Sequence, residues 1–315
     1  MNILITGCAG FVGTNLALKL LENPNNLVIG IDNMLAGKPS HVRKLSQYLN
    51  FRFIEIDCKD TKKLLNEALP TIDLLFHLAA NSDIAAAFSN PTIDFDLGIG
   101  TTHAMLEFAR VSKVKHFIFS SGSGVYGENP NQIFTEESFV GQPTSTYGAT
   151  KLASEALISA YSFMFDMRAT VFRFSNLIGP HQTHGVIHDF MTRLKSEPEH
   201  LRVQGDGTQL KPYIHILDAL NGVLLAISCQ SALFEVFNVS NSSATSVKDI
   251  AGIVIQELNL SNVSVQFQDS DRGWKADIPK YMMSSDKLMK YGWELRYNSD
   301  SAVRQTIRDN SPTPN

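Results

Sequence analysis

A tyrosine and a lysine four residues apart, Tyr147 and Lys151, have the residue types and the spacing to form a general base. On a helix, residues with this spacing lie one above the other on the same face. An ammonium held beside a phenol stabilises the phenolate and lowers the pKa of the tyrosine from about 10 toward neutrality. The same spacing also occurs by chance on solvated helix faces. Whether the pair forms a site therefore depends on the elements around it.

The residues that lead to this pair predict a strand, a glycine-rich loop over 122–127, and a helix that contains Tyr147 and Lys151. In the first half of the chain, short apolar runs alternate with segments of helical periodicity. The expected strands cover 2–6, 27–31, 51–56, 73–77, 116–121 and 169–174, and the expected helices cover 14–21, 61–69, 91–111 and the segment through 151 to 165. Apolar strands that alternate with helices predict an α/β fold, in which a doubly wound parallel sheet is covered on both faces.

A glycine pattern follows the first expected strand and opens the first expected helix. Gly7 permits a tight turn, Gly10 lets the backbone approach a pyrophosphate, and Gly13 allows close packing of the helix on the strand. The free N–H groups of Phe11 and Val12 at the helix N-terminus would face the phosphates. The pattern in this position predicts a bound dinucleotide.

Two aspartates refine that prediction. Asp32 ends the second expected strand, where its carboxylate can accept hydrogen bonds from both ribose hydroxyls and would repel a 2′-phosphate. Asp57 ends the third expected strand, where it could meet the adenine amine. Together they favour NAD over NADP as the cofactor.

The second half of the chain is less regular and predicts a smaller, interleaved C-terminal lobe. Expected elements are a helix within 181–198, strands near 201–207, 213–216 and 236–239, and helices over 217–228, 247–258 and 299–308. We expect the dinucleotide-binding domain to cover 1–178 plus about 213–242, and the substrate lobe to cover 179–212 plus about 243–315. His181, His184 and His188 lie three and four apart, but the intervening glycine argues against one helix, and we expect no metal site.

Composition excludes several classes of protein. The 315 residues are 43% hydrophobic and 18% charged, with a net charge of −4 and no basic run, which argues against a nucleic-acid partner. The three cysteines are scattered, and no apolar run is long enough to cross a bilayer. We expect a cytoplasmic protein with no membrane partner.

Several motifs together resemble the extended short-chain dehydrogenase/reductase family, and within it the nucleotide-sugar epimerases that act on UDP-galactose. The motifs cover nearly the whole chain: the glycine pattern, Asp32, Asp57, His77-Leu-Ala-Ala80, Ser120-Ser-Gly-Ser-Gly-Val-Tyr-Gly127, Tyr147-x-x-x-Lys151, Arg173-Phe-Ser-Asn-x-x-Gly-Pro180 and Gly205-Asp-Gly-x-Gln209.

The resemblance implies a reaction and a set of site residues. Tyr147 would take a proton from a sugar hydroxyl while hydride leaves the same carbon for NAD, and Lys151 would hold the nicotinamide ribose. The implied cofactor-binding residues are Gly7, Gly10, Phe11, Val12, Gly13, Asp32, Asn33, Asp57, Cys58, Leu78, Ala79, Ala80, Tyr147, Lys151 and Phe174. The implied residues for a nucleotide-diphosphate sugar are Ser82, Ser123, Tyr147, Asn176, Val186, Lys211 and Arg272. Lys211 stands where the family usually places an arginine, so the diphosphate contact would lack the guanidinium fork.

The chain departs from the family at Gly122, where a Ser or Thr usually bonds the reacting sugar oxygen. Ser123 is our first choice of substitute and Ser121 the second. A water could serve instead, or both serines could only satisfy loop backbone groups. Ser123 and Gly124 also stand where dehydratases carry Asp-Glu and decarboxylases carry Glu. Neither residue can shuttle a proton, so the resemblance favours epimerisation at C4.

Other functions remain open at this point. A 4-keto-reductase would consume cofactor, and a non-catalytic NAD-binding regulatory protein would fit the loss of the hydroxyl at Gly122. The resemblance also implies a homodimer, in which the helices over 91–111 and 151–165 pair across a two-fold axis into a four-helix bundle. Ile158, Tyr161 and Phe165 would supply apolar surface for it.

Overall fold

The computed structural model describes residues 1–81, 83 and 85–311, which form two compact units. Unit 1 comprises 1–125, 140–173 and 229–237, and unit 2 comprises 126–139, 174–228 and 238–315. The units are interleaved along the chain, and the segments 126–139 and 213–228 belong to unit 2.

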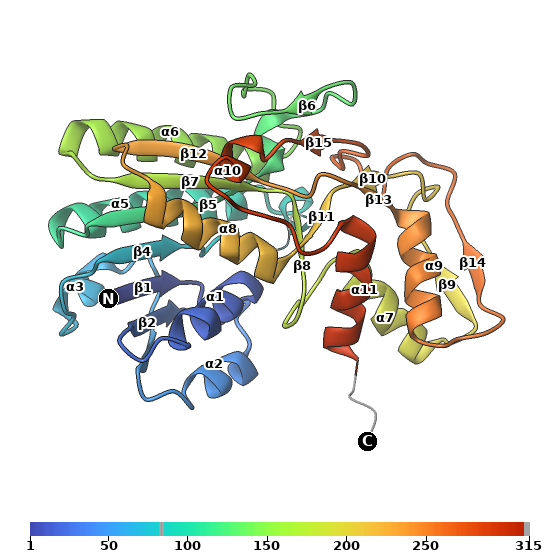
Figure 1. Cartoon of the computed structure of the whole chain (residues 1–315), viewed down its shortest axis with the longest axis horizontal. Helices are drawn as coiled ribbons and strands as arrows, with labels where there is room; N and C mark the ends of the chain where they lie inside the picture. Colours follow the sequence, from blue (N-terminus) through green and yellow to red (C-terminus); the bar gives the residue numbers. More distant parts are fainter. Residues whose placement is uncertain (82, 84, 312–315) are drawn as a thin grey trace. The chain divides into compact units, whose positions relative to one another are not determined.

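Unit 1 is built on a seven-stranded sheet of order β12-β7-β5-β4-β1-β2-β3 (Figure 1). Pairs β1–β2, β2–β3, β1–β4 and β4–β5 are parallel. The strands are β1 (Asn2–Thr6), β2 (Leu27–Asp32), β3 (Phe51–Glu55), β4 (Leu74–His77), β5 (His116–Gly122), β7 (Ala169–Phe174) and β12 (Phe234–Val239). The order runs outward in both directions from β1 and β4, so the switch point, where α/β sheets bind ligands, lies between these two strands.

Helices connect these strands on the pattern expected from the sequence. They are α1 (Phe11–Leu21), α2 (Pro39–Leu45), α3 (Thr61–Asn66), α4 (Thr92–Asp94), α5 (Thr101–Val111) and α6 (Thr146–Phe165), with short 3₁₀ turns η1 (Ala85–Phe88) and η3 (Ser123–Tyr126). A π-helical turn, η2 (Phe95–Gly100), joins α4 to α5. The expected helix over 91–111 is thus confirmed, with a wide turn in its middle.

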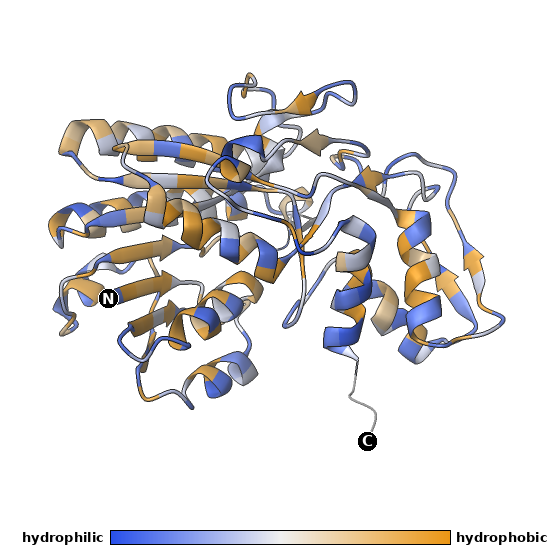
Figure 2. Ribbon diagram, in the orientation of Figure 1, coloured by the Kyte–Doolittle hydropathy of each residue, from blue (hydrophilic) through white to orange (hydrophobic). Residues whose placement is uncertain are grey.

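The core of unit 1 explains why the strands are apolar on both faces. Side chains from α3, α5 and α6 pack on one face of the sheet, in a cluster that includes Leu4, Phe117 and Ile158. Ile3 and Ile5 alternate with Leu4 along β1 and are fully buried as well, while α1 contacts β1 and β2. Figure 2 shows β1, β2 and β4 as predominantly hydrophobic ribbons. The doubly wound α/β fold is confirmed.

Unit 2 consists of small sheets and helices. Its elements are β6 (Ile133–Phe134), β8 (Asn176–Ile178), α7 (Val186–Ser196), β9 (His200–Arg202), β10 (Leu210–Lys211), β11 (Tyr213–His215), α8 (Ile216–Cys229), β13 (Thr245–Ser246), α9 (Val247–Glu257), β14 (Ser264–Gln266), β15 (Met282–Met283), α10 (Asp286–Met289) and α11 (Ser299–Asn310). A second apolar core joins α7, α9 and α11 with β9.

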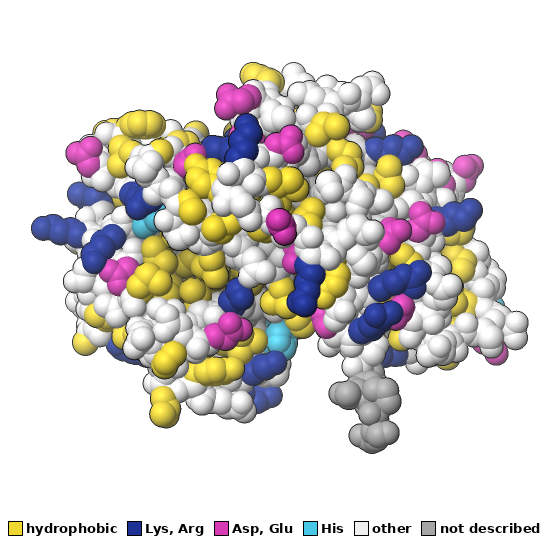
Figure 3. Space-filling model, in the orientation of Figure 1, with side chains coloured by type: hydrophobic (Ala, Val, Ile, Leu, Met, Phe, Trp, Pro, Cys, Tyr) yellow, Lys and Arg dark blue, Asp and Glu magenta, His cyan; other side chains and the backbone are white. Residues whose placement is uncertain are grey.

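Surface features agree with the composition. On the face drawn in Figure 3, Lys and Arg side chains lie interspersed with Asp and Glu. Among the residues that the structure describes, no helix is both long and apolar enough to cross a membrane.

Candidate functional site

The glycine turn between β1 and α1 is held by close backbone contacts. Gly7 has φ +68°, and a Cβ there would lie 3.0 Å from the amide nitrogen of Ala79. A Cβ on Gly13 would lie 2.2 Å from the carbonyl oxygen of Gly7. A side chain at Gly13 would clash with the backbone, and one at Gly7 would be strained by the positive φ and the close contact, so both positions favour glycine because of contacts within the protein itself.

Gly10 differs from the other two glycines. Among described atoms, a Cβ there would meet only the Gly7 carbonyl oxygen within 4 Å, at 3.3 Å. Gly10 is the N-cap of α1, and no side chain caps the N–H groups of that first turn, which includes Phe11 and Val12. A helix N-terminus with open donors and a residue without a side chain fits the pyrophosphate of a dinucleotide.

The residues expected at the adenosine end lie at the ends of β2 and β3. Buried Asp32 accepts hydrogen bonds from the N–H groups of Ala9 (3.0 Å) and Met34 (2.9 Å), one on each oxygen, which leaves further lone pairs for ribose hydroxyls. Burial raises the pKa of its carboxyl. The Asn33 amide donates to Asp57 (3.0 Å).

Cys58 follows Asp57 and is buried. Burial raises the pKa of its thiol to about 12, so the side chain is a neutral apolar group here.

The turn after β4 is fixed by a residue that we did not single out in the sequence. The Thr6 hydroxyl accepts hydrogen bonds from the N–H groups of Leu78 and Ala79, both at 3.0 Å, and lies 2.9 Å from Nδ1 of His77. This positions Leu78, Ala79 and the half-buried Ala80 beside the glycine turn. Burial lowers the pKa of His77 to about 3, so its ring is neutral. In the sequence, the signal for this role of Thr6 is a hydroxyl-bearing residue at the end of the first expected strand.

Tyr147 and Lys151 lie on the first two turns of α6, as expected. Ser145 caps this helix by accepting from the Gly148 N–H (3.1 Å). Lys151 is buried; its ammonium donates to the Ser120 carbonyl (2.6 Å) and lies 5.6 Å from the centroid of the Tyr147 ring. Tyr147 itself is half-buried.

The expected lowering of the tyrosine pKa is wrong for this arrangement. Burial raises the pKa of Tyr147 to about 12, and the charge of Asp94 adds to that rise. Lys151 lies over the rings of Phe119 and Tyr147 and bonds a carbonyl. Burial lowers the pKa of Lys151 to about 8, against the opposing charge of Glu155.

The two candidate serines differ in their surroundings. The Ser121 hydroxyl is buried and donates to Glu155 (2.5 Å), which also pairs with Arg173 (2.7 Å). Ser123 begins η3, is half-buried, and its hydroxyl has no hydrogen-bond partner among described residues. Because the Ser121 hydroxyl already donates to a buried ion pair, Ser121 is the weaker candidate for binding the reacting sugar oxygen. The geometry therefore favours Ser123.

The loop after β5 packs directly against the first turn of α6. A Cβ on Gly148 would lie 2.7 Å from the Gly124 carbonyl oxygen. This backbone contact holds Ser123 and Gly124 next to the turn that carries Tyr147. The loop therefore presents a hydroxyl and no carboxylate there.

Lys211 and Arg272, the two cationic residues expected to bind a diphosphate, both contact Asp277 within unit 2. Lys211 forms an ion pair with the Asp277 carboxylate, and the Arg272 guanidinium donates to the Asp277 carbonyl (2.8 Å). Arg272 also makes two parallel hydrogen bonds to Glu128, at 2.8 and 3.0 Å. Sequence reasoning missed Glu128 and the role of Asp277 as the link.

The remaining expected residues are dispersed. The Asn176 side chain accepts from the Tyr281 hydroxyl (2.8 Å), Val186 is the first residue of α7, and Phe174 is buried at the end of β7. Ser82 lies outside the described residues. In the described part of the chain, no group of three His, Cys, Asp or Glu residues is placed to hold a metal ion.

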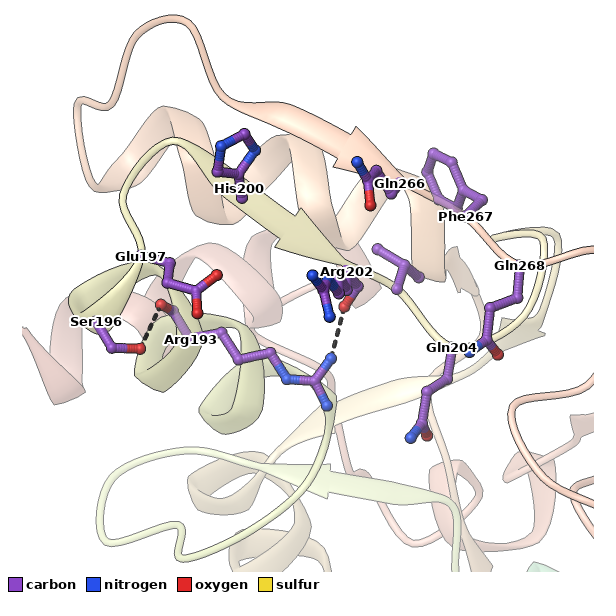
Figure 4. A pocket seen from close by; sticks show the side chains of 10 residues that line it. Arg193, Ser196, Glu197, His200, Arg202, Gln204, Gln266, Phe267 and Gln268 are labelled. Atoms are coloured by element: carbon purple, nitrogen blue, oxygen red, sulfur yellow. Dashed lines mark hydrogen bonds between the residues drawn. The ribbon is translucent and has the colours of Figure 1, made fainter.

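Unit 2 also contains a pocket of about 420 Å³ beside β9 and β14 (Figure 4). It is lined by Arg193, Ser196, Glu197, His200, Arg202, Val203, Gln204, Gln266, Phe267 and Gln268. The Arg193 guanidinium donates to the Arg202 carbonyl (2.5 Å) across one side of it. The side-chain amides of Gln204, Gln266 and Gln268 and the ring of Phe267 make this pocket suitable for a planar polar group.

Comparison with known proteins places this chain in a family. A model described as the NAD dependent epimerase/dehydratase family matches residues 3–240. The chain belongs to this family. The resemblance to extended short-chain dehydrogenases/reductases is thereby confirmed, and so is NAD as the cofactor, which the open N-terminus of α1 fits.

Members of the epimerase/dehydratase family similar to this chain include both kinds of enzyme. A crystal structure of UDP-galactose 4-epimerase has a TM-score of 0.86 and 32% identity, covering 98% of each chain. A putative UDP-glucose 4-epimerase of Methanocaldococcus jannaschii is 25% identical over 97% of each chain. The human dTDP-D-glucose 4,6-dehydratase is 26% identical over 97% of this chain and 89% of its own. The choice between the two reactions therefore rests on the site.

Proposed function

We propose that the protein is an NAD-dependent nucleotide-sugar 4-epimerase, with a UDP-hexose as the favoured substrate. The observation that carries this proposal is the loop at Ser123 and Gly124, which lies against the turn bearing Tyr147 and has no acidic side chain. Elimination of water needs a proton donor at the leaving hydroxyl. Epimerisation needs only one base that takes a proton and returns it.

The proposed reaction uses Tyr147 at the C4 hydroxyl of the sugar. The phenolate takes the hydroxyl proton while hydride leaves C4, so C4 is oxidised to a ketone. Bound NAD would supply the acceptor, and later the donor, for this hydride. The 4-keto sugar turns over, receives the hydride on its other face, and its oxygen regains the proton from Tyr147. Lys151 would hold the nicotinamide ribose and Ser123 the reacting oxygen.

The diphosphate and the base would be held by residues of unit 2. We propose Lys211 and Arg272 for the diphosphate and Asn176 and Val186 for the sugar-phosphate and sugar. Arg272 supplies a planar fork suited to phosphate oxygens, and Lys211 supplies a point charge. The pocket lined by Gln204, Gln266 and Gln268 is our choice for the nucleotide base.

The test is incubation of the protein with a panel of UDP-sugars without added reductant, followed by NMR or chromatography. Interconversion at C4 with no net cofactor consumption is expected. If no sugar of the panel changes at C4, the epimerase assignment is wrong. Stoichiometric use of NADH would identify a keto-reductase, and loss of water from the sugar would identify a dehydratase.

Gly122 supports a second candidate, an NAD-binding protein without turnover. The position three residues before Val125 carries no hydroxyl to bond the reacting oxygen. This candidate predicts tight NAD binding and no change in any nucleotide sugar. It also predicts no effect of Tyr147→Phe on the biological role.

We also propose a homodimer formed through α5 and α6. Phe163, Met164 and Phe165 are exposed at the end of α6, with relative exposures of 66%, 71% and 42%. Ile158, which we expected on this surface, is instead fully buried in the core of unit 1. Light scattering that finds only monomer at micromolar concentration would contradict the dimer.

We also predict a cytoplasmic location. The three cysteines are free, which agrees with a reducing compartment.

A further inference from the structure

A buried ion pair that the proposed reaction does not use lies one helical turn beyond Lys151. Glu155 on α6 and Arg173 on β7 are each only 5% exposed. The Arg173 guanidinium donates to both carboxylate oxygens of Glu155, and its shortest hydrogen bond is 2.7 Å. The Ser121 hydroxyl, near the end of β5, donates to the same carboxylate (2.5 Å). Three elements of unit 1 therefore meet at Glu155.

The end of β5 also holds the ammonium of Lys151. The Ser120 carbonyl accepts from it at 2.6 Å, and the centroid of the Phe119 ring lies 4.7 Å from it. Phe119, Ser120 and Ser121 are consecutive residues of β5. Lys151 and Glu155 are four apart on α6, so they share one face of the helix. The same short piece of β5 thus contacts two side chains on successive turns of α6.

These contacts make the position of the Lys151 ammonium depend on Glu155. A lysine ammonium sits on a flexible stem, so its place is set by the acceptor that it bonds. The acceptor here, the Ser120 carbonyl, is a backbone group and moves only with the strand. The hydrogen bond from Ser121 to Glu155 ties that part of the strand to α6.

A buried ion pair is a weak source of net stability, because the cost of moving two charges out of water offsets much of their attraction. The Arg173 guanidinium nevertheless fixes the orientation of the Glu155 carboxylate, since its planar fork bonds both oxygens. Burial lowers the pKa of Lys151 to about 8, and the charge of Glu155 opposes that lowering. Both effects favour a protonated ammonium in a fixed place.

We propose that Glu155, held by Arg173, is a positioning residue that fixes the end of β5 on α6 and so places the Lys151 ammonium for the cofactor. The inference rests on the proposed role of Lys151 at the nicotinamide ribose. The adenosine and the pyrophosphate would be held elsewhere, by Asp32 and the open N-terminus of α1. Loss of Glu155 should therefore weaken the hold on the nicotinamide ribose and leave the hold on the adenosine diphosphate part unchanged.

The test compares NAD with ADP, which has the adenosine and both phosphates and lacks the nicotinamide ribose. Both affinities are measured by calorimetry on the full chain freed of bound cofactor. Glu155→Gln keeps the shape of the side chain and removes its charge. It should raise the Kd for NAD by about tenfold, the value of one hydrogen bond, and change the Kd for ADP by less than about twofold.

A double-mutant cycle with Lys151→Met shows whether Glu155 acts through the ammonium. Lys151→Met alone should raise the Kd for NAD by a similar factor. Adding Glu155→Gln should then change the ratio of the two affinities no further, because the group that Glu155 positions is gone. Ser162→Ala is the matched control, since Ser162 is fully buried on α6 and donates to the Leu233 carbonyl (3.3 Å). It should lower stability and leave both affinities unchanged.

Each outcome supports or overturns the proposal. Equal weakening of NAD and ADP binding by Glu155→Gln would indicate a general structural role and overturn it, and so would two unchanged affinities. A further loss of NAD affinity on adding Glu155→Gln to Lys151→Met, or an unchanged NAD affinity in Lys151→Met alone, would also overturn it.

If Glu155→Gln does not fold, Ser121→Ala is titrated with the same expectation, because it cuts the link from β5 and keeps the ion pair. The binding experiment needs no turnover. The expected loss of NAD affinity in a protein that converts no UDP-sugar would uphold the positioning role and reject the proposed function.

Discussion

Two connections, each between a strand and a helix of unit 1, carry the candidate chemistry, and they work in different ways. In the connection from β1 to α1, the groups that we propose to face the ligand are backbone N–H groups, and close contacts inside the protein disfavour a side chain at Gly7 and Gly13. In the connection from β5 to α6, the groups that we propose to act on the substrate are the side chains of Ser123 and Tyr147. The first proposed site depends on the absence of side chains, and the second depends on their chemistry.

The difference teaches which substitutions alter binding and which alter turnover. The open donors at α1 are present whatever side chains the helix carries, so that site depends on the shape of the backbone. The pKa of Tyr147 is raised by burial and by the charge of Asp94, which ends α4, a different element from the helix that carries Tyr147. Mutations in the two connections should therefore separate NAD affinity from catalysis.

Tyr147→Phe should give the largest effect. Removal of a positioned general base lowers turnover by about 10²–10⁴-fold. NAD binding should change little, because the pyrophosphate would be held at α1. The measurement is initial rate on the active UDP-sugar, with NAD affinity by calorimetry as the control. Unchanged turnover would remove Tyr147 from the proposed reaction.

Gly13→Ala and Gly10→Ala form a matched pair for the first connection. At Gly13 the new methyl would lie 2.2 Å from a carbonyl oxygen, so we expect a loss of about 1–3 kcal/mol in the free energy of unfolding. At Gly10 the nearest described atom is 3.3 Å away, so stability should change little while NAD affinity falls. Denaturant titration and calorimetry report the two quantities. Equal destabilisation by both variants would contradict the distinction between these glycines.

The buried ammonium of Lys151 should make stability depend on pH. Its pKa in the folded protein is about 8, below the ordinary value of 10.5, so the unfolded chain binds more protons between these values. The free energy of unfolding from this group therefore rises as pH increases from 8 to 10, by up to about 2 kcal/mol. Denaturant midpoints across this range measure the rise in the free energy of unfolding, and Lys151→Met is the control that should lack this rise. A stability that falls equally in both proteins would contradict the prediction.

The sequence predicted what depends on local pattern. The strand–glycine–helix order at Gly7 to Gly13 and the spacing of Tyr147 and Lys151 are local, and both connections lie where we expected them. The basicity of Tyr147 was not predictable, since Asp94 reaches α6 from 52 residues earlier in the chain, through Thr146. The pairing of Arg272 with Glu128 spans 144 residues and leaves no periodic signal. Likewise, Ser121 and Ser123 look alike in the sequence and differ only in what surrounds them.

Ser121→Ala and Ser123→Ala, the smallest expected effects, test the second connection. Ser121 donates to the buried Glu155, so its loss leaves that carboxylate one donor short and should cost about 1–2 kcal/mol of stability. Ser123 has no described partner to lose, so Ser123→Ala should keep its stability and lower turnover by roughly tenfold, the value of one substrate hydrogen bond. Thermal unfolding and initial rates measure the two effects on the same preparations. If Ser121→Ala were the slower enzyme at full stability, the hydroxyl assignment would move to Ser121. If neither variant changed turnover, a water or the backbone would bind the reacting oxygen at Gly122.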